Sequence, residues 1–230
     1  MTFARTVLTA PAFAAGLALL TIGVTQPSYA ATNDYLAEGS VTATELIPPP
    51  PEMDSAAFDT QMAIVEWEQL IRTPEQVAFV EIPLTVERFW PVIGPDMFTV
   101  DAAALKEVID HSIDEVRFDY DALKSVYDLP RPFVVNDAIE PIGEVRPVAA
   151  YPSGHSIRAV VYARLLSEAF PQHEDDLINL AERIGYGRVT GGVHYPVDVL
   201  AGQILGHAYA DAITANPAFQ EAIAELRVSS

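Results

Sequence analysis

Hydrophobic side chains recur at helical spacing through most of the chain. Between residues 99 and 118 they fall at i, i+3, i+4, i+8 and i+11, a stripe along one helix face: Leu105, Val108, Ile109, Ile113 and Val116. Residues 55–71 show a similar spacing with Ser55 as an N-cap, whereas residues 74–84 are ambiguous. We therefore expect helices over 55–71 and 99–118.

The same spacing predicts four more helices in the C-terminal half. We expect them at about 154–170, 173–186, 195–214 and 217–228. Pro196 falls in the first turn of the third, where proline is tolerated. Almost no stretch alternates hydrophobic and polar residues as a half-buried strand does. The predicted fold class is all-α, a single-domain helical bundle around one core.

Two segments lack any regular period. Residues 31–55 are predicted to form an irregular, Pro-rich N-terminal arm that contains the stretch IPPPPEM. Residues 129–152 are also rich in proline, and we expect a long loop there. A loop of this length inside a compact domain is usually functional.

The first 30 residues have the pattern of a secretory signal peptide. Arg5 provides the positive charge, an apolar run follows, and small residues Ser28 and Ala30 lie where a signal peptidase cleaves. An uncleaved membrane anchor is the alternative, but the apolar run is short for a membrane span and ends at Pro27. We expect a signal peptide over 1–30, the arm over 31–55, one folded domain over 56–230, and a periplasmic or secreted bacterial protein.

Charge and composition exclude several classes of function. Removing residues 1–30 leaves 200 of the 230 residues and takes away only Arg5, so the net charge goes from −19 to −20. Nucleic-acid binding needs a basic face and is not expected. The chain has no cysteine, which excludes disulfides and thiolate metal sites. Because an acidic surface repels anions, any phosphate site must be a local cluster of positive charge.

Three short clusters carry the candidate chemistry. Lys124 is followed after six residues by Arg131-Pro132; PSGH ends at His155; and Arg188 is followed by His194 and then Asp198. By contrast, Arg146 also precedes a proline, but the residue seven positions before it is not a lysine.

Taken singly, each cluster has an ordinary structural explanation. Lys124 and Arg131 could be solvated charges, and a lone His155 is more often a capping or packed residue than a catalyst. Asp198 could simply cap a helix. Alternatively, it could accept the imidazole N–H of His194 and fix which nitrogen is free. Two adjacent glycines between Arg188 and His194 allow the chain to bring both to one point.

Together the clusters supply what phosphoryl transfer needs. The reaction requires cations on the phosphate oxygens, backbone N–H donors, a nucleophile and an acid for the leaving group. Three residues are the cations: Lys124, Arg131 and Arg188. The turn at 153–155, at a helix N-terminus, provides N–H groups and a favourable dipole. One histidine can attack while the other donates a proton, without a metal or a thiol.

The three signatures, in this order over residues 124–198, resemble those of the PAP2 phosphatase superfamily, which includes class A acid phosphatases, lipid phosphatases and vanadium haloperoxidases. The exported N-terminus, the LIPPPPE arm and the size look most like the class A non-specific acid phosphatases. The resemblance implies the helical bundle of the PAP2 and vanadium haloperoxidase type.

The resemblance also implies roles for individual residues. His194 would attack phosphorus and become a phosphohistidine, Asp198 would orient it, and His155 would protonate the leaving alcohol. The remaining signature residues would hold the phosphate oxygens: Lys124, Arg131, Ser153, Gly154 and Arg188. One departure concerns the third signature, which normally begins Ser-Arg and here reads Gly187-Arg188. The loss of a hydroxyl there leaves phosphate affinity or the placement of Arg188 in question.

The leading hypothesis is an exported acid phosphatase that needs neither metal nor cofactor and acts on small phosphomonoesters. Two alternatives stay open, a vanadate-dependent haloperoxidase and a non-catalytic periplasmic phosphate-binding protein. We expect no nucleic-acid partner and no membrane span in the mature chain, and we leave a homo-oligomer open. Three histidines receive structural interpretations: His111, His173 and His207, the last expected to be packed inside its helix.

Overall fold

The computed structural model describes residues 35–146 and 148–226, and the statements below refer to these. The expected signal peptide, residues 1–30, and residues 31–34 of the arm lie outside the described residues. Within the described ranges the chain forms helices and no β-strand: α1 (Ala43–Leu46), α2 (Ala56–Ile71), α3 (Pro74–Glu81), η1 (Val86–Phe89), α4 (Trp90–Ile93), η2 (Gly94–Thr99), α5 (Ala102–Tyr127), α6 (Pro132–Val135), α7 (Gly154–Ala169), η3 (Pro171–His173), α8 (Glu174–Thr190), α9 (Pro196–Thr214) and α10 (Pro217–Glu225). The predicted all-α class is confirmed.

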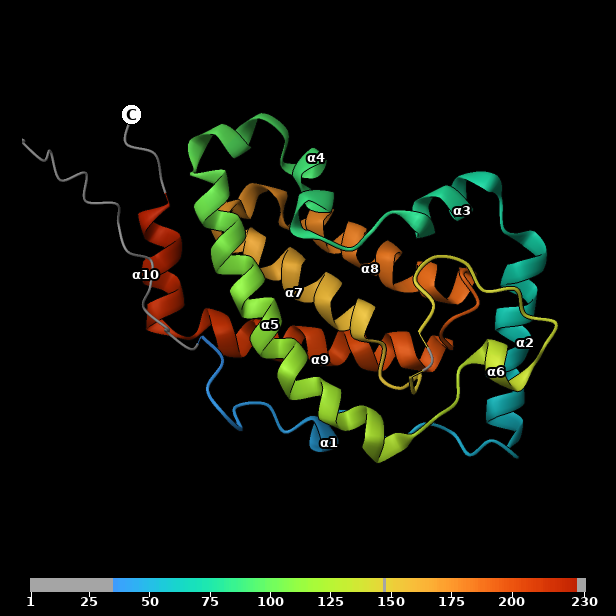
Figure 1. Cartoon of the computed structure of the whole chain (residues 1–230). Coiled ribbons are helices and arrows are strands. Elements are labelled where there is room, and N and C mark those ends of the chain that lie inside the picture. The colour runs from blue at the N-terminus through green and yellow to red at the C-terminus, as the bar shows by residue number, and fades with distance from the viewer. Residues whose placement is uncertain (1–34, 147, 227–230) are drawn as a thin grey trace, which may run out of the picture. The chain divides into compact units, whose positions relative to one another are not determined.

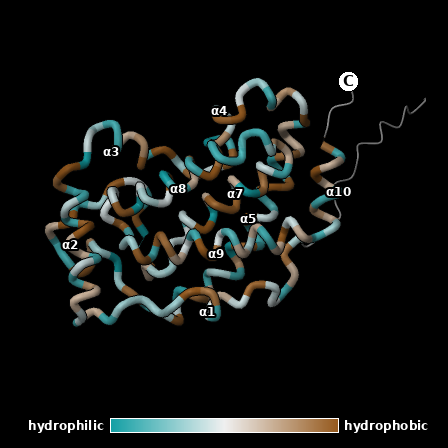
Figure 2. Tube along the Cα trace, turned by 180° about the vertical axis from the view of Figure 1, so that it is seen from behind, coloured by the Kyte–Doolittle hydropathy of each residue, from teal (hydrophilic) through white to brown (hydrophobic). Residues whose placement is uncertain are grey.

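Helix α7 is the centre of the bundle. It packs against α5, α8 and α9, which surround it in Figure 1. Most of its side chains are fully buried because helices cover it on several sides. Hydrophobic segments, brown in Figure 2, recur along these helices with hydrophilic ones between them, as amphipathic packing requires. The first turn of α7 carries PSGH, so the most buried helix also positions this motif.

The outer helices close the two ends of the bundle. Helices α2 and α3 pack on α8, and α2 also contacts α9, at the right in Figure 1. Helix α10 packs on α5, α7 and α9 at the opposite end. No helix in the described part of the chain combines the length and the hydrophobicity that crossing a membrane requires.

Side-chain caps explain several helix starts. Ser55 accepts a hydrogen bond from the Phe58 N–H at 3.1 Å and begins α2, as the sequence predicts. Thr73 and Gln76 form a reciprocal capping box, with Pro74 next in the chain, and this fixes the ambiguous stretch as a helix from residue 74. Asp101 caps α5, whose whole predicted stripe is buried.

Some expectations are wrong in detail. Helix α5 continues nine residues beyond 118, and α8 continues four beyond 186. The loop at 129–152 contains the short helix α6. His207 is exposed rather than packed, because α9 buries the face on the other side of the helix, which includes Leu205 and Tyr209.

Candidate active site

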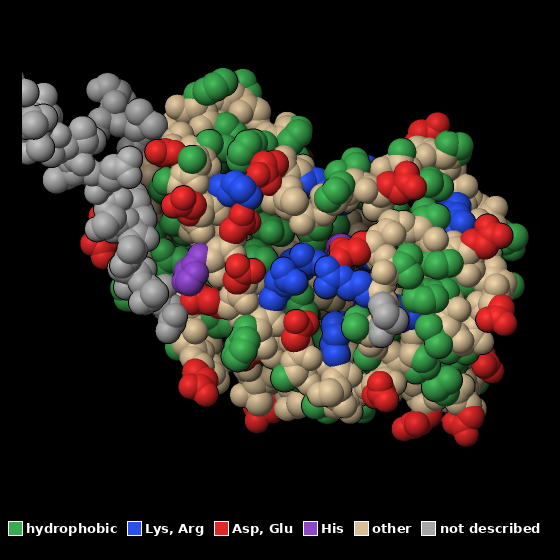
Figure 3. All heavy atoms as spheres, in the orientation of Figure 1, with side chains coloured by type: hydrophobic (Ala, Val, Ile, Leu, Met, Phe, Trp, Pro, Cys, Tyr) green, Lys and Arg blue, Asp and Glu red, His purple; other side chains and the backbone are tan. Residues whose placement is uncertain are grey.

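A cleft of about 490 Å³ opens beside the N-terminus of α7 and collects the signature residues. Lys124, Arg131 and Gly154 line it together with His155, Arg188 and His194. In Figure 3, Lys and Arg side chains gather in the middle of the visible face, while most acidic side chains lie around its margin. Residues 70 positions apart in the sequence thus meet at one positively charged hollow.

The turn between α8 and α9 places His194 at the bottom of this cleft. Gly192 has a φ of +69°, a left-handed conformation that glycine adopts without strain. The His194 N–H donates to the Arg188 carbonyl at 3.2 Å. His194 is 1 % exposed. The two adjacent glycines therefore bring Arg188 and His194 together, as predicted.

His194 is held at both ring nitrogens. Its Nδ1 lies 3.0 Å from Asp198 Oδ2, which also accepts the Tyr195 N–H at 2.9 Å. Its Nε2 lies 3.0 Å from a guanidinium nitrogen of Arg131. Because arginine can only donate, Nε2 must accept, and the single proton of the neutral ring is on Nδ1. The lone pair of Nε2 therefore faces the cations of the cleft.

Burial and the surrounding cations keep His194 uncharged. They hold the pKa of His194 well below its usual range, with Arg131 the largest of the charge effects. Burial raises the pKa of Asp198 to about 7, against the Tyr195 hydrogen bond that lowers it. Asp198 is fully buried, and its second oxygen, Oδ1, has no hydrogen-bond partner among the described residues.

The three signature cations converge from different elements. Lys124, in the last turn of α5, donates to the Pro152 carbonyl at 2.8 Å and the Ala149 carbonyl at 3.3 Å. Arg131 Nε donates to the Val148 carbonyl at 2.9 Å. Burial lowers the pKa of Lys124 to about 8.

Arg188 has a buried side-chain N–H that donates no hydrogen bond to any described residue. It is 4 % exposed, and its Nη2 donates to the Glu144 carbonyl at 2.6 Å. Its buried Nε has no partner among residues 35–146 and 148–226. Burial lowers the pKa of Arg188 to about 10, which still leaves it charged at neutral pH. A buried, charged donor without an acceptor favours an anionic ligand.

Ser153 and Gly154 occupy the start of α7. Ser153 is the N-cap, and its hydroxyl oxygen accepts from the Ser156 N–H at 3.3 Å and the Ser156 hydroxyl at 3.0 Å. The Ser153 N–H is already bonded to the Asp198 carbonyl at 3.0 Å. Gly154 lies against Tyr120, whose hydroxyl would be 2.8 Å from a Cβ at this position. A larger residue at position 154 would therefore collide with Tyr120 at the N-terminus of α7.

His155 faces an acidic partner that sequence reasoning missed. Its Nε2 lies 3.1 Å from Glu144 Oε2, and its Nδ1 lies 3.4 Å from a nitrogen of Arg158. The hydrogen bond from His155 lowers the pKa of Glu144 to about 2. Burial lowers the pKa of His155 to about 3, while Glu144 opposes this shift and Arg188 adds to it. An anion in the cleft would offset the cations and favour the protonated ring.

Further cleft residues were also missed by sequence reasoning. Glu144 forms an ion pair with Arg146, the residue set aside above because no lysine precedes it at the signature spacing. Arg117, Tyr120 and Arg158 line the cleft as well. The only sequence signal for Glu144 and Arg146 is their place in a long Pro-rich loop, which predicts function without naming residues.

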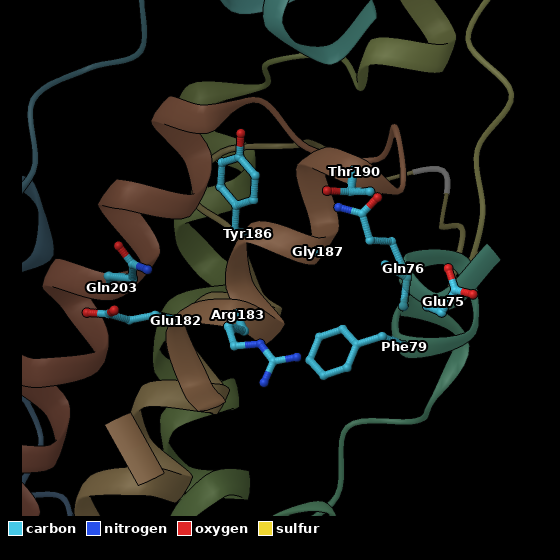
Figure 4. Close-up of a pocket in the computed structure, with 10 residues that line it drawn as sticks. Glu75, Gln76, Phe79, Glu182, Arg183, Tyr186, Gly187, Thr190 and Gln203 are labelled. Atoms are coloured by element: carbon cyan, nitrogen blue, oxygen red, sulfur yellow. The ribbon is translucent and has the colours of Figure 1, made fainter. Parts of the chain in front are cut away.

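Gly187, which replaces the usual serine of the third signature, lies on the side of α8 that faces away from the cationic cleft. A Cβ at Gly187 would be 3.3 Å from Val80 Cγ2 of α3, and Gly187 does not line the cationic cleft. It lines a separate pocket between α3 and α8, shown in Figure 4, in which Phe79 and Tyr186 are prominent. A serine hydroxyl at position 187 would therefore affect the packing of α3 on α8 more directly than the contacts to a phosphate.

Other interpretations concern metals and the remaining histidines. Across the described ranges, no group of three or more histidine, aspartate and glutamate side chains is placed to hold a metal ion. His111 lies 3.3 Å from Glu115, and His173 lies 2.8 Å from Asp96. Both of these contacts with a carboxylate lie outside the cleft.

The fold and the site define an all-α protein with a cation-lined cleft that ends on a buried histidine–aspartate pair. The chain belongs to the PAP2 superfamily, whose family model matches residues 105–220. This confirms the resemblance that the three signatures indicate.

Curated relatives and solved structures agree with this assignment. A non-specific acid phosphatase of Salmonella typhi is 28 % identical over 201 residues, covering 83 % of this chain and 80 % of the relative. One of Providencia stuartii is 26 % identical over 193 residues, covering 79 % and 78 %.

Two solved structures share the fold. A transmembrane PAP2-type phosphatidylglycerolphosphate phosphatase from Bacillus subtilis has a TM-score of 0.54 at 22 % identity, over 71 % of this chain and 87 % of that one. A bacterial vanadium-dependent iodoperoxidase has a TM-score of 0.57 at 17 % identity, over 78 % and 54 %.

Proposed function

We propose that this protein is an exported acid phosphatase that hydrolyses small phosphomonoesters through a phosphohistidine at His194. The observation that carries the proposal is the state of His194: Nδ1 bonded to Asp198, and Nε2 carrying its lone pair at the bottom of a cationic cleft. The curated relatives named as non-specific acid phosphatases support the same activity.

In the first step, the phosphate of the ester binds among Lys124, Arg131 and Arg188. The donor that Arg131 gives to His194 Nε2 turns to a phosphate oxygen. Nε2 then attacks phosphorus, the bond to the leaving oxygen breaks, and protonated His155 gives its proton to that oxygen. The phosphorylated imidazole keeps its Nδ1 proton and becomes cationic, so the Asp198 carboxylate stabilises it.

In the second step, water attacks the phosphohistidine. His155, now neutral, takes a proton from the water as the P–N bond breaks, and inorganic phosphate is released. Both histidines return to their starting states. The three cations and the N-terminus of α7 stabilise the charge on the equatorial oxygens throughout. None of these steps calls for a metal, and metal independence is part of the proposal.

The test is phosphate release from p-nitrophenyl phosphate in excess EDTA at mildly acidic pH. His194→Ala is expected to lower kcat by about 10⁴-fold or more, because it removes the nucleophile. His207→Ala, an exposed histidine on α9, is the matched control and should leave kcat unchanged. Mass spectrometry of an acid-free quench should locate the phosphoryl group on His194.

Three outcomes would contradict the proposal. Full activity in a folded His194→Ala variant would exclude His194 as the nucleophile. Halide oxidation that appears only with vanadate and peroxide, without ester hydrolysis, would favour a haloperoxidase. Tight phosphate binding without turnover would indicate a binding protein.

A further inference from the structure

The cleft holds more positive charge than one phosphate needs. The whole chain has 13 lysines and arginines, and six of them line this cleft. Three belong to the signatures, and the other three form an outer set: Arg117, Arg146 and Arg158. The whole chain has a net charge of −19, so this concentration of cations is local. The proposed mechanism gives a role to the three signature cations and none to the other three.

Helix α5 sets the separation between the inner and outer cations. Arg117, Tyr120, Asp121 and Lys124 line the cleft at i, i+3, i+4 and i+7, so they share one face of the helix. Seven residues at 1.5 Å each place Arg117 about 10 Å from Lys124 along the helix axis. A ligand that reaches both residues must therefore extend outward from the phosphate position.

Two of the outer arginines have no carboxylate partner. Within residues 35–146 and 148–226, neither Arg117 nor Arg158 forms an ion pair with an acid. Arg158 donates only to the Gly154 carbonyl at 3.2 Å and approaches His155. The Arg117 side chain is half-buried, lines the cleft and donates no hydrogen bond to any described residue. Arg146 is neutralised by Glu144.

The acids of the cleft do not cancel this charge. Asp121, Asp128 and Glu144 are the lining carboxylates, so the six cations leave a surplus of three positive charges. A bound phosphomonoester dianion would compensate two of them. The charge that remains is that of Arg117 and Arg158, and Arg158 lies 3.4 Å from His155, the residue proposed to protonate the leaving group.

We propose that Arg117 and Arg158 form a second anion subsite for the leaving group. The preferred substrates are then phosphomonoesters whose leaving group carries a second phosphate or a carboxylate, roughly 6–10 Å from the scissile phosphate given the helical rise. Arginine binds both groups in a bidentate manner. The inference rests on the proposed function for the position of the scissile phosphate.

Binding of non-hydrolysable phosphonates tests the subsite without turnover. Calorimetry in EDTA would compare propane-1,3-diylbisphosphonate with propylphosphonate. One added charge-assisted contact predicts that the bisphosphonate binds about 10-fold more tightly or better. Arg117→Gln should remove most of this ratio and leave propylphosphonate affinity within about 2-fold, as expected for a residue outside the inner cluster.

Two controls separate a subsite from general charge attraction. Arg164→Gln makes the same change on α7 at a residue that pairs with Asp211 outside the cleft, and it should leave the ratio intact. Bisphosphonates with spacers of two to six carbons should show one preferred length. 3-Phosphonopropionate distinguishes a carboxylate from a phosphate as the second group.

The outcomes are separable from those of the proposed function. Equal affinity of the mono- and bisphosphonate, a flat dependence on spacer length, or an unchanged ratio in Arg117→Gln would each overturn the subsite. Turnover of p-nitrophenyl phosphate combined with any of these overturns the subsite alone. A bisphosphonate preference without turnover keeps the subsite and overturns the phosphatase.

Discussion

The two neighbours of His194 decide where its proton lies. Asp198 accepts from Nδ1 and Arg131 donates toward Nε2, so only one tautomer satisfies both. Asp198 is itself held by the Tyr195 N–H, which fixes the direction of the carboxylate. As the proposed nucleophile, His194 depends on the acceptor Asp198 as much as on its own ring.

Asp198→Asn tests this dependence. An amide can donate to Nδ1 as well as accept, so the Nε2-protonated tautomer becomes available and the lone pair is lost from the reacting side. We expect kcat to fall by about 10²- to 10⁴-fold with little change in the fold. Steady-state kinetics would measure the loss, and ¹⁵N NMR of the ring would report the tautomer. Unchanged kcat would show that Asp198 only caps α9.

Glu144→Gln should change the pH dependence of kcat/KM. Glu144 raises the pKa of His155 through its hydrogen bond and charge, against the burial that lowers that pKa to about 3. Without the carboxylate the pKa of His155 falls further. In the proposed mechanism kcat/KM requires protonated His155, so the basic limb of kcat/KM should then move to lower pH.

The control for this variant is Glu140→Gln, an exposed residue of the same loop, which should leave the profile in place. A uniform loss of kcat/KM at every pH in Glu144→Gln would indicate a merely structural role.

Spacing rules explain which site residues were predictable. The signatures fix Lys124, Arg131 and His155 by their sequence context, and the structure brings these residues together. Glu144 reaches His155 from a loop with no period, so no spacing relates the two. Arg117 could not be predicted either. It lies on α5 seven residues before Lys124, outside the first signature, and in the sequence it resembles a solvated charge.

At the scale of elements, α7 and α9 approach unusually closely because of two glycines. A Cβ at Gly202 would be 2.6 Å from the Ser153 carbonyl oxygen and 2.8 Å from Ser156 Cβ. A Cβ at Gly206 would be 2.7 Å from Val160 Cβ. The contact at Gly202 lies directly under the cap of α7, so the packing of these helices positions the PSGH turn.

Gly202→Ala is expected to destabilise the protein. Helix propensity would favour alanine by about 1 kcal/mol, but overpacking against backbone costs about 1–3 kcal/mol and α7 must shift. We expect a lower denaturation midpoint and a lower kcat/KM together. Gly187→Ala, where the nearest atom is a Val80 methyl at 3.3 Å, should lose less stability. The reverse order of stabilities would contradict this account of the packing.

The spacing of hydrophobic residues predicted that the helices exist, but it did not predict where they end. The stripe of α5 fades after Val116, although the helix continues to Tyr127 because Tyr120 packs beneath Gly154 and Lys124 binds loop carbonyls. In α8, two glycines suggest an end near 186. The helix continues to Thr190 because both glycines are contact points, Gly185 against Ser156 and Gly187 against Val80.

For the molecule as a whole, the six cations that line the cleft are a source of electrostatic repulsion. Burial, and after it the neighbouring cations, lower the pKa values of Lys124, Arg188 and His194, so the charged form of each is less favourable in the folded state than in water. An anion that binds only the folded protein relieves this repulsion and stabilises the fold.

Inorganic phosphate should therefore raise Tm. At 100 times its Kd it adds about 2.7 kcal/mol, or a shift of about 5–10 °C for a chain of this size. Chloride at equal ionic strength is the control, and Arg188→Ala should lose most of the shift. Differential scanning calorimetry would measure it. Equal shifts with phosphate and chloride would mean that no specific anion site exists.

The hydrogen bond between Arg131 and His194 also affects what the resting protein can react with. Diethyl pyrocarbonate acylates unprotonated imidazole, and it would find His207 open to solvent but His194 closed at both nitrogens. Both nitrogens of His194 are therefore protected from an electrophile in solution. In the proposed mechanism an arriving phosphate takes the hydrogen bond of Arg131 and frees Nε2 in the same event, so the nitrogen becomes reactive only when a phosphate is already bound.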